Sequence, residues 1–189
     1  CAPGTGPEHL QMLFTLAEAR TPQADTVLRV LLMNAQPSPL RVDAAVSGLG
    51  GRELEFLEGL FSDPLCSPDR RDHSRLVQRL AQCVALEGAP DRIDHLLGLA
   101  SYRKTADWQQ LALLDGIAST VPVASKGQPA PMVRPVRFSK QPRGWEALQR
   151  VEAPEVRERV AKVAPLISWE GDGRAIDAGR AAALSVAEQ

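Results

Sequence analysis

The sequence predicts an all-α protein built as an α-solenoid, an array of stacked helical hairpins interrupted by one long Pro-rich loop. Three observations support this prediction. Aromatic residues make up only 4% of the chain, whereas Leu, Ala, Glu and Arg abound, which favours helix over strand. Apolar residues recur at i, i+3, i+4 and i+7 in segments separated by Pro and Gly. The leading helices are centred near residues 45, 80 and 113, so they recur about every 35 residues.

The bulk composition limits the classes of function. The chain has 189 residues, with 22 basic and 23 acidic residues and a formal net charge of -1. A balance of this kind provides no overall field that would attract nucleic acid, anionic lipid or an acidic substrate. No apolar run approaches the roughly 18 residues that a membrane-spanning helix needs.

Residues 7–34 predict the first helical hairpin. In residues 7–20, apolar side chains form one stripe at Leu10, Leu13, Phe14 and Ala17. Thr21 is expected to cap a second helix with Pro22 in its first turn. The apolar face of that helix consists of Val27, Leu28, Leu31 and Leu32. Because the connection is so short, the two helices must fold back on each other.

The same pattern recurs further along the chain. Residues 40–49 predict a short helix, Gly50 and Gly51 break it, and residues 52–61 resume it. After a Pro-rich loop, two further helices are centred on residues 76–84 and 93–100, and another begins at Trp108. Each hairpin has apolar faces that it cannot bury alone, so stacking is expected to bury them in a continuous core. The alternative is a compact irregular bundle of the same helices.

Residues 121–144 interrupt the helical pattern. Prolines exclude helix here at positions 122, 129, 131, 135 and 142. One interpretation is a solvated loop that crosses the stack and packs on it through Met132, Val133, Val136 and Phe138. The other is a basic docking loop for a protein partner, formed by Arg134, Arg137, Phe138, Lys140 and Arg143.

The rest of the chain returns to helix. Helices are expected at residues 145–151 and from Pro154 until Pro165 ends the second one, with a loop at 168–173 and an Ala-rich helical tail at 175–187. The predicted organisation is a flexible N-terminal segment at 1–6, helical repeats at 7–120, the basic crossing loop at 121–144 and C-terminal helices at 145–189.

The cysteines allow two modifications. Cys1, followed by a small, flexible segment, is the position at which a mature bacterial lipoprotein carries its lipid; the alternative is a fragment boundary that falls at a cysteine. Cys66 and Cys83 could form a disulfide in an oxidising compartment. Alternatively, Cys83 is a small core residue, because it lies among Leu and Val in a helix.

No catalytic, cofactor-binding or metal-binding residue is predicted. His9, His73 and His95 are each isolated in the sequence and are expected at the surface. The pairs Asp72–His73 and Asp94–His95 are adjacent, so on a helix their side chains point about 100° apart and share no site. The chain contains no CxxC, HExxH, CxxCH, Walker or GxSxG motif.

Two sets of residues carry a resemblance to known families. The stretch from Arg41 to Leu57 resembles a HEAT repeat. The segments 108–117, 144–148 and 169–171 together resemble the helical region of large bacterial exported proteins that join a dehydrogenase-type β-propeller to a c-type cytochrome domain. In that family a haem-binding CxxCH follows a segment like 178–180, whereas this sequence carries neither that motif nor a propeller.

The favoured function is therefore a non-catalytic structural or docking scaffold within an exported bacterial electron-transfer assembly. The resemblance implies a periplasmic location and protein partners of the cytochrome type, with membrane contact only through a lipid on Cys1. A free-standing HEAT-type adaptor that binds a protein or peptide, which could be cytoplasmic, is the alternative. A HEAT-like nucleic-acid enzyme ranks third, because such an enzyme needs a strongly basic face.

Overall fold

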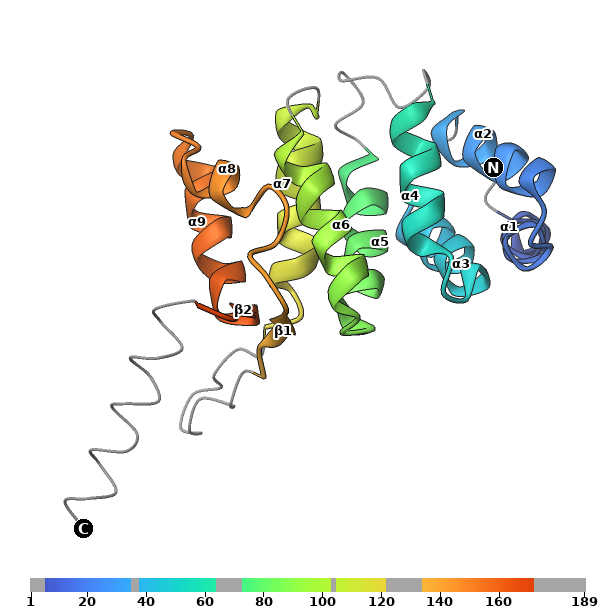
Figure 1. The fold of residues 1–189 in the computed structure, drawn as a ribbon. Helices are drawn as coiled ribbons and strands as arrows, with labels where there is room; N and C mark the ends of the chain where they lie inside the picture. Colours follow the sequence, from blue (N-terminus) through green and yellow to red (C-terminus); the bar gives the residue numbers. More distant parts are fainter. Residues whose placement is uncertain (1–5, 35–37, 64–72, 103–104, 122–133, 172–189) are drawn as a thin grey trace, which may run out of the picture.

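The computed structural model describes residues 6–34, 38–63, 73–102, 105–121 and 134–171. Among these residues it is mostly helical, with nine helices and almost no strand, which confirms the predicted all-α class (Figure 1). The elements are α1 (Pro7–Glu18), α2 (Pro22–Asn34), α3 (Pro39–Leu49), α4 (Glu53–Ser62), α5 (Ser74–Leu86), α6 (Pro90–Ser101), α7 (Asp107–Ala118), β1 (Val136–Phe138), α8 (Trp145–Gln149), α9 (Pro154–Val163), the 3₁₀ turn η2 (Ala164–Leu166) and β2 (Ile167–Trp169).

Proline and short polar residues set most helix starts. Five helices begin at a proline, whose fixed φ suits the first turn and whose missing N–H would have no partner there. The predicted cap of α2 is confirmed, because the Ala24 N–H donates to the Thr21 hydroxyl over 3.2 Å. At the other end of a helix, Gly50 adopts a left-handed conformation with φ 52° and stops α3.

Arg20 adopts a left-handed conformation that favours glycine. Its φ is 50°, and it lies two residues before the proline that starts α2. Gly88 has φ 67° two residues before Pro90, the start of α6, so glycine occupies the corresponding turn. We expect Arg20→Gly to raise the free energy of unfolding by about 0.5–1 kcal/mol, because relief of the strain exceeds the extra entropy of the unfolded glycine.

Chemical denaturation followed by circular dichroism measures this difference. Arg20→Ala is the control, because it removes the same side chain and keeps the strained φ. Equal stability of the alanine and glycine variants would show that the backbone conformation at this position is not strained.

The odd-numbered helices pack on one another in chain order. Helices α1, α3, α5, α7 and α9 pack on one another in succession, while α6 packs on α5, α7 and α8. The most extensive contacts join helices that are two apart in the sequence, α1 with α3 and α5 with α7. The core runs through these contacts and continues at its C-terminal end to Trp145, Val163 and Ile167.

Glycine allows close approach at two of the helix contacts. A Cβ on Gly48 of α3 would lie 2.6 Å from the Ala17 Cβ and 2.7 Å from the Phe14 carbonyl oxygen of α1. A Cβ on Gly116 of α7 would lie 2.7 Å from the Ala81 Cβ of α5 and would also meet the Gln78 carbonyl oxygen. In both cases the glycine faces the carbonyl oxygen of one residue of the neighbouring helix and the Cβ of the residue three positions later in that helix. The α1–α3 and α5–α7 contacts are therefore equivalent, with Phe14 corresponding to Gln78 and Ala17 to Ala81.

The predicted end of the third helix is confirmed. The prediction ended this helix at Leu49 and placed the break at Gly50 and Gly51, and α3 ends at Leu49. Only Gly50 and Gly51, with φ values of 52° and 89°, form the turn. Gly48 lies in the helix because its missing side chain lets α1 approach.

Ion pairs join the first four helices to the next pair. Arg79 of α5 contacts Asp43 of α3 at 3.4 Å. Helix α6 forms two ion-pair contacts with α4, Arg92–Glu55 at 2.8 Å and His95–Glu58 at 2.7 Å. Partly exposed pairs of this kind contribute little stability, but they favour one alignment of the helices. We call this boundary the α4–α6 junction.

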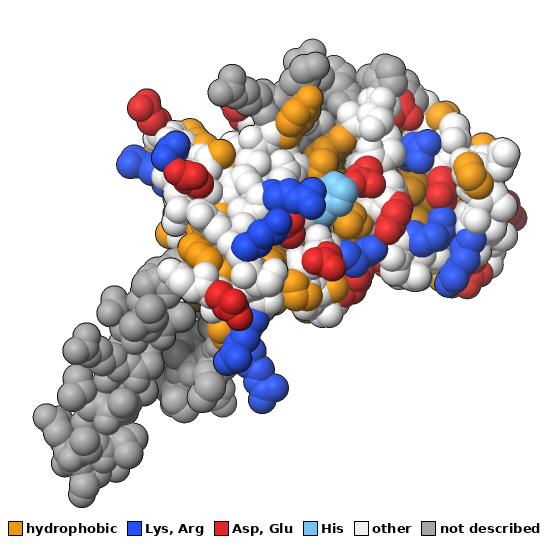
Figure 2. Space-filling model, in the orientation of Figure 1, with side chains coloured by type: hydrophobic (Ala, Val, Ile, Leu, Met, Phe, Trp, Pro, Cys, Tyr) orange, Lys and Arg blue, Asp and Glu red, His pale blue; other side chains and the backbone are white. Residues whose placement is uncertain are grey.

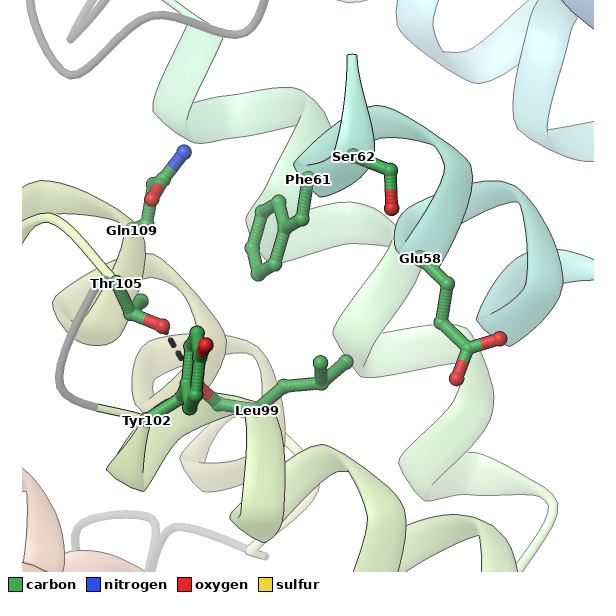
Figure 3. Close-up of a pocket in the computed structure, with 7 residues that line it drawn as sticks. All are labelled: Glu58, Phe61, Ser62, Leu99, Tyr102, Thr105 and Gln109. Carbon is green, nitrogen blue, oxygen red and sulfur yellow. Dashed lines mark hydrogen bonds between the residues drawn. The ribbon is translucent and has the colours of Figure 1, made fainter.

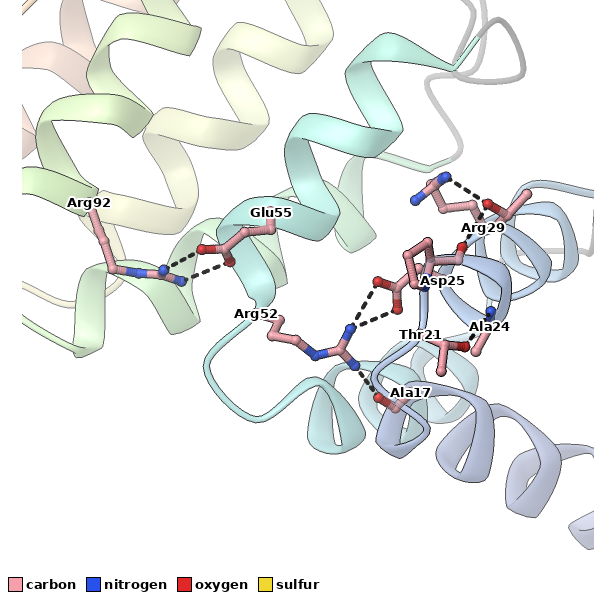
Figure 4. A network of polar contacts seen from close by, with 10 residues as sticks. Ala17, Thr21, Ala24, Asp25, Arg29, Arg52, Glu55 and Arg92 are labelled. Atoms are coloured by element: carbon pink, nitrogen blue, oxygen red, sulfur yellow. Dashed lines mark hydrogen bonds and ion pairs between the residues drawn. The ribbon is translucent and has the colours of Figure 1, made fainter.

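Arg52 ties the turn between α3 and α4 to the turn between α1 and α2 (Figure 4). Its guanidinium donates two hydrogen bonds of 2.9 Å to the Asp25 carboxylate of α2 and a further one to the Ala17 carbonyl at the end of α1. The guanidinium carries several N–H donors in one plane. It can therefore bind a carboxylate and satisfy a helix-end carbonyl at the same time. Arg52 therefore fixes the start of α4 against the α1–α2 turn.

The described C-terminal region contains a small sheet that was not predicted. Residues 136–138 and 167–169, both expected to include loop, form β1 and β2 and pair in parallel with Val136 opposite Ile167. Three-residue strands are too short for alternation to be recognised, and their pairing depends on residues about 30 positions apart. Pro165 is followed by this strand rather than directly by a loop. The predicted tail helix at 175–187 lies outside the described residues.

Candidate protein-binding groove

The α4–α6 junction contains an open hollow of about 480 Å³ (Figure 3). It lies between α4 and the end of α6, and the turn into α7 closes one side. Its lining residues are Glu58, Phe61, Ser62, Leu99, Tyr102, Thr105 and Gln109. We call this hollow the α4–α6 groove. Its volume lies within the range of pockets that hold small molecules or a few side chains.

Aromatic and aliphatic side chains form the apolar part of the groove. Phe61 and Leu99 pack against the core from α4 and α6 while remaining partly open. Tyr102, the residue that follows α6, is 58% exposed. Figure 3 shows the Phe61 and Tyr102 rings on opposite sides of the hollow. An exposed tyrosine provides a large contact area at low entropic cost, which is why such residues are frequent in protein interfaces.

Hydrogen bonds hold the turn that carries Tyr102. The Tyr102 N–H donates to the Leu99 carbonyl over 3.3 Å, and the Thr105 N–H donates to the Tyr102 carbonyl over 2.9 Å. The Thr105 hydroxyl donates to the Leu99 carbonyl over 2.8 Å. These bonds satisfy the last carbonyl groups of α6 and fix the direction in which the tyrosine leaves the helix.

Polar groups occupy the edges of the groove. Glu58 is paired with His95 at 2.7 Å, and both side chains remain partly exposed. On the opposite edge, the Gln109 side-chain oxygen accepts a hydrogen bond of 3.0 Å from the Ala106 N–H, which closes the first turn of α7. The groove therefore combines an apolar floor with one carboxylate and one fixed amide.

Potential metal ligands and the Cys83 thiol are the reactive groups to consider among the described residues. Within these residues, no group of three or more His, Cys, Asp or Glu side chains could hold a metal ion. Burial raises the pKa of the Cys83 thiol, with opposing attraction from Arg79 and further raising by Glu53. A thiol with a raised pKa is mostly protonated at neutral pH and is a weak nucleophile. Burial also lowers the pKa of Arg41, whose guanidinium contacts the His9 ring at 2.9 Å.

The basic docking loop is only partly available for binding. Arg134, Arg137 and Lys140 are exposed, but Phe138 is buried at 7% exposure in the core. Arg143 is anchored to α6, because its guanidinium contacts Asp94 at 3.0 Å and its backbone N–H donates to the same carboxylate. The described part of this segment thus packs on the array, as the crossing-loop interpretation expected. A shallow hollow of about 350 Å³ remains beside Arg137, Trp169 and Glu170.

The predicted modification sites lie mostly outside the described residues. This is true of Cys1 and of Cys66, so the lipid and the disulfide stay predictions. Cys83 is half-buried and packs against the core, in line with the interpretation of a small core residue.

All three histidines were expected at the surface, and this prediction is wrong for His73. His73 is only 4% exposed, and its Nε2 lies 3.3 Å from the Leu32 carbonyl oxygen at the end of α2. The prediction for His73 was wrong because its contact partner is 41 residues away in the sequence. The adjacent residues Asp94 and His95 have different partners, Arg143 and Glu58, as their helical spacing predicted.

The sequence interpretation missed the groove itself. Tyr102 was not singled out, although it is the only tyrosine of the chain. The sequence signal that could have indicated this site was a large aromatic residue, Tyr102, directly after the predicted helix. On the visible face, basic and acidic side chains are interspersed around apolar ones (Figure 2).

No family model, curated protein or solved structure matches this chain. None of the helices in the described part of the chain is both long and apolar enough to cross a membrane.

Proposed function

We propose that this protein is a non-catalytic scaffold that docks other proteins, and that the α4–α6 groove is its docking site. The observation that carries the proposal is the exposed Tyr102, on a backbone turn held by hydrogen bonds, beside the apolar side chains of Phe61 and Leu99. Aromatic anchors next to apolar pockets provide most of the binding energy in protein interfaces.

We further propose that the array is a HEAT-like α-solenoid. Its support is the alternating order of packing, in which each odd-numbered helix lies against the next odd-numbered one. The equivalent contacts at Gly48 and Gly116 give further support, because they indicate that the same packing of two helices occurs twice. Repeated units that contact mainly their neighbours define a solenoid, and such proteins bind partners along extended surfaces.

The groove chemistry indicates what the partner presents. The open hollow between Phe61 and Tyr102 accepts an aliphatic or aromatic side chain from a polypeptide. Glu58 contacts the His95 ring through one carboxylate oxygen and stays partly exposed, so it favours a neighbouring hydrogen-bond donor or cation on the partner. We therefore expect a segment with an apolar anchor next to a basic or amide side chain.

The resemblance to exported propeller–cytochrome proteins supplies the partner class of the proposal. A c-type cytochrome domain of an exported electron-transfer assembly is the partner that we propose to test first. A free-standing adaptor would instead bind a partner without haem, so the haem absorbance of the captured protein distinguishes the two functions.

Substitution at the groove rim tests the docking site. We expect Tyr102→Ser to weaken partner binding by at least about 30-fold, because it removes an interface anchor. Leu86→Ser is the matched control, since Leu86 is 66% exposed on α5 and Tyr102 is 58% exposed. Affinity capture from the cells that produce the protein identifies the partner, and titration with that partner compares the variants. Equal binding by the Tyr102 and Leu86 variants would contradict the proposed site.

A further inference from the structure

A polar pair joins α1 to α3 near the start of both helices. The Arg41 guanidinium contacts the His9 ring, with 2.9 Å between Nη2 and Nε2. A guanidinium can only donate hydrogen bonds, so Nε2 accepts and the ring is uncharged in this contact. Arg41 is 7% exposed, whereas His9 is partly exposed. The pair therefore places one positive charge in a region that is largely closed to water.

Arg41 lacks the countercharge that other enclosed arginines have. The Nε atoms of Arg41, Arg52 and Arg92 are all enclosed and without a hydrogen-bond partner. Arg52 nevertheless contacts Asp25 at 2.9 Å, and Arg92 contacts Glu55 at 2.8 Å. Within the described parts of the chain, no carboxylate forms an ion pair with Arg41. A buried charge without a partner of opposite charge is costly, so its presence requires an explanation.

The pKa values of two arginines reflect the same difference. Burial lowers the pKa of Arg41, and no acid opposes this effect. Burial also acts to lower the pKa of Arg92, but Glu55 and Glu87 raise it above its ordinary value. The described surroundings of Arg41 thus leave its charge without compensation.

The neighbouring sequence does not supply the missing acid. Segments 1–5 and 35–37, which precede α1 and α3, contain no Asp or Glu. Glu8 is adjacent to His9 on α1 but is exposed, and successive side chains of a helix point about 100° apart. The compensating charge is therefore expected from outside these segments.

The second pair of packed helices shows that packing does not require a charge at this position. The equivalence of the α1–α3 and α5–α7 contacts matches His9 to His73 and Arg41 to Gln109. Arg41 and Gln109 are both 7% exposed, so corresponding positions hold a cation in one pair and a neutral amide in the other. Gln109 still lines the open α4–α6 groove, so a residue this buried can contribute to a binding site.

The two helices add to the positive potential beside Arg41. Helices α1 and α3 run parallel, because His9 contacts Arg41 near their starts and Ala17 lies against Gly48 near their ends. Their N-terminal ends, which carry partial positive charge, therefore lie together. The first turn of α3 contains no acid, and Ser38 forms no side-chain cap. This environment favours an anion.

We propose that Arg41, oriented by His9, binds a small oxyanion, either a phosphate or a carboxylate group. The guanidinium carries several N–H donors in one plane, and the His9 contact uses one of them. The remaining donors match two oxygen atoms of such a group. The bound anion would supply the countercharge that the described residues do not provide.

Thermal unfolding of the 189-residue chain, followed by circular dichroism at neutral pH, tests the site. We expect sodium phosphate or sodium acetate to raise the Tm in a saturable way, compared with sodium chloride at equal ionic strength. The expected rise is about 3–5 °C at roughly ten times the dissociation constant. The anion that acts at the lower concentration identifies the bound group as phosphate or carboxylate, and isothermal titration calorimetry measures its binding directly.

Variants separate this site from general salt effects. Arg41→Gln copies the residue of the second helix pair, so it is expected to fold and to lose the stabilisation. Arg41→Lys keeps the charge without the planar donors and is expected to raise the dissociation constant about tenfold, which gives a second test if the glutamine variant does not fold. Arg75→Gln removes an exposed cation of α5 and is expected to leave the effect unchanged.

Three results would overturn the proposal. One is the absence of saturable stabilisation of the wild-type chain by either anion. Another is equal stabilisation of the wild-type chain and the Arg41 variants. The third is loss of the effect in Arg75→Gln, which would place the anion elsewhere.

Discussion

Replacing Gly116 with alanine is expected to lower the free energy of unfolding by about 2–3 kcal/mol, because the new methyl group forces α5 and α7 apart. The added Cβ would lie 2.7 Å from the Ala81 Cβ, a distance that real Cβ atoms essentially never show, and 3.0 Å from the Gln82 backbone nitrogen, which is also unusually short. These neighbours belong to helix backbone and a short side chain, which cannot rotate away. The cost therefore includes displacement of a whole helix.

Gly98→Ala is the matched control for this substitution. Gly98 also lies inside a helix, α6, but a Cβ there meets only the Arg143 Cβ at 3.9 Å. Alanine is expected to stabilise this helix by about 0.5–1 kcal/mol. Urea denaturation followed by circular dichroism gives both values. If the two substitutions change stability by the same amount and sign, the close approach of α5 and α7 is refuted.

Trp145→Ala is expected to have the largest effect, a loss of about 3–5 kcal/mol. Trp145 is 0% exposed and belongs to the core from the first position of α8. Gly144, with φ 69°, packs against Ser101 and the Leu97 carbonyl of α6 and brings the indole to this position. Losing the ring leaves a cavity where α8 meets α6, so the C-terminal part of the array loses its attachment.

Glu146→Ala provides the comparison for Trp145. It changes the next residue of the same helix, whose side chain is 63% exposed. Surface changes of this kind are expected to stay within about 0.5 kcal/mol. Far-UV circular dichroism is the appropriate signal, because the first variant removes a tryptophan and so alters fluorescence. Equal denaturation midpoints for the two variants would show that the indole does not hold α8 to the array.

Local signals in the sequence were sufficient for most of the helices. The i, i+3, i+4 spacing at Leu10, Leu13 and Ala17 and the prolines at helix starts depend only on neighbouring residues, and the structure has helices at these segments. The cap at Thr21 could be predicted for the same reason, since its partner is three residues away.

Features that depend on distant residues could not be predicted. Gly48 was predicted inside a helix, but only the position of Ala17 on α1 shows that it is a packing residue. Phe138 was named both in a packed crossing loop and in a docking loop, and only its pairing with β2 and its burial in the core decide for packing. The groove likewise arises because α4 and α6 meet through ion pairs, which no local pattern indicates.

Site-specific photo-crosslinking from position 102 tests the proposed docking function most directly. A photoreactive phenylalanine replaces Tyr102 in the full chain, and the same residue at Leu86 serves as the control of similar exposure. If the α4–α6 groove docks a protein, illumination in the producing cells is expected to join position 102 to one discrete partner and position 86 to none. The absence of a crosslink at position 102, or the same products from both positions, would contradict the account.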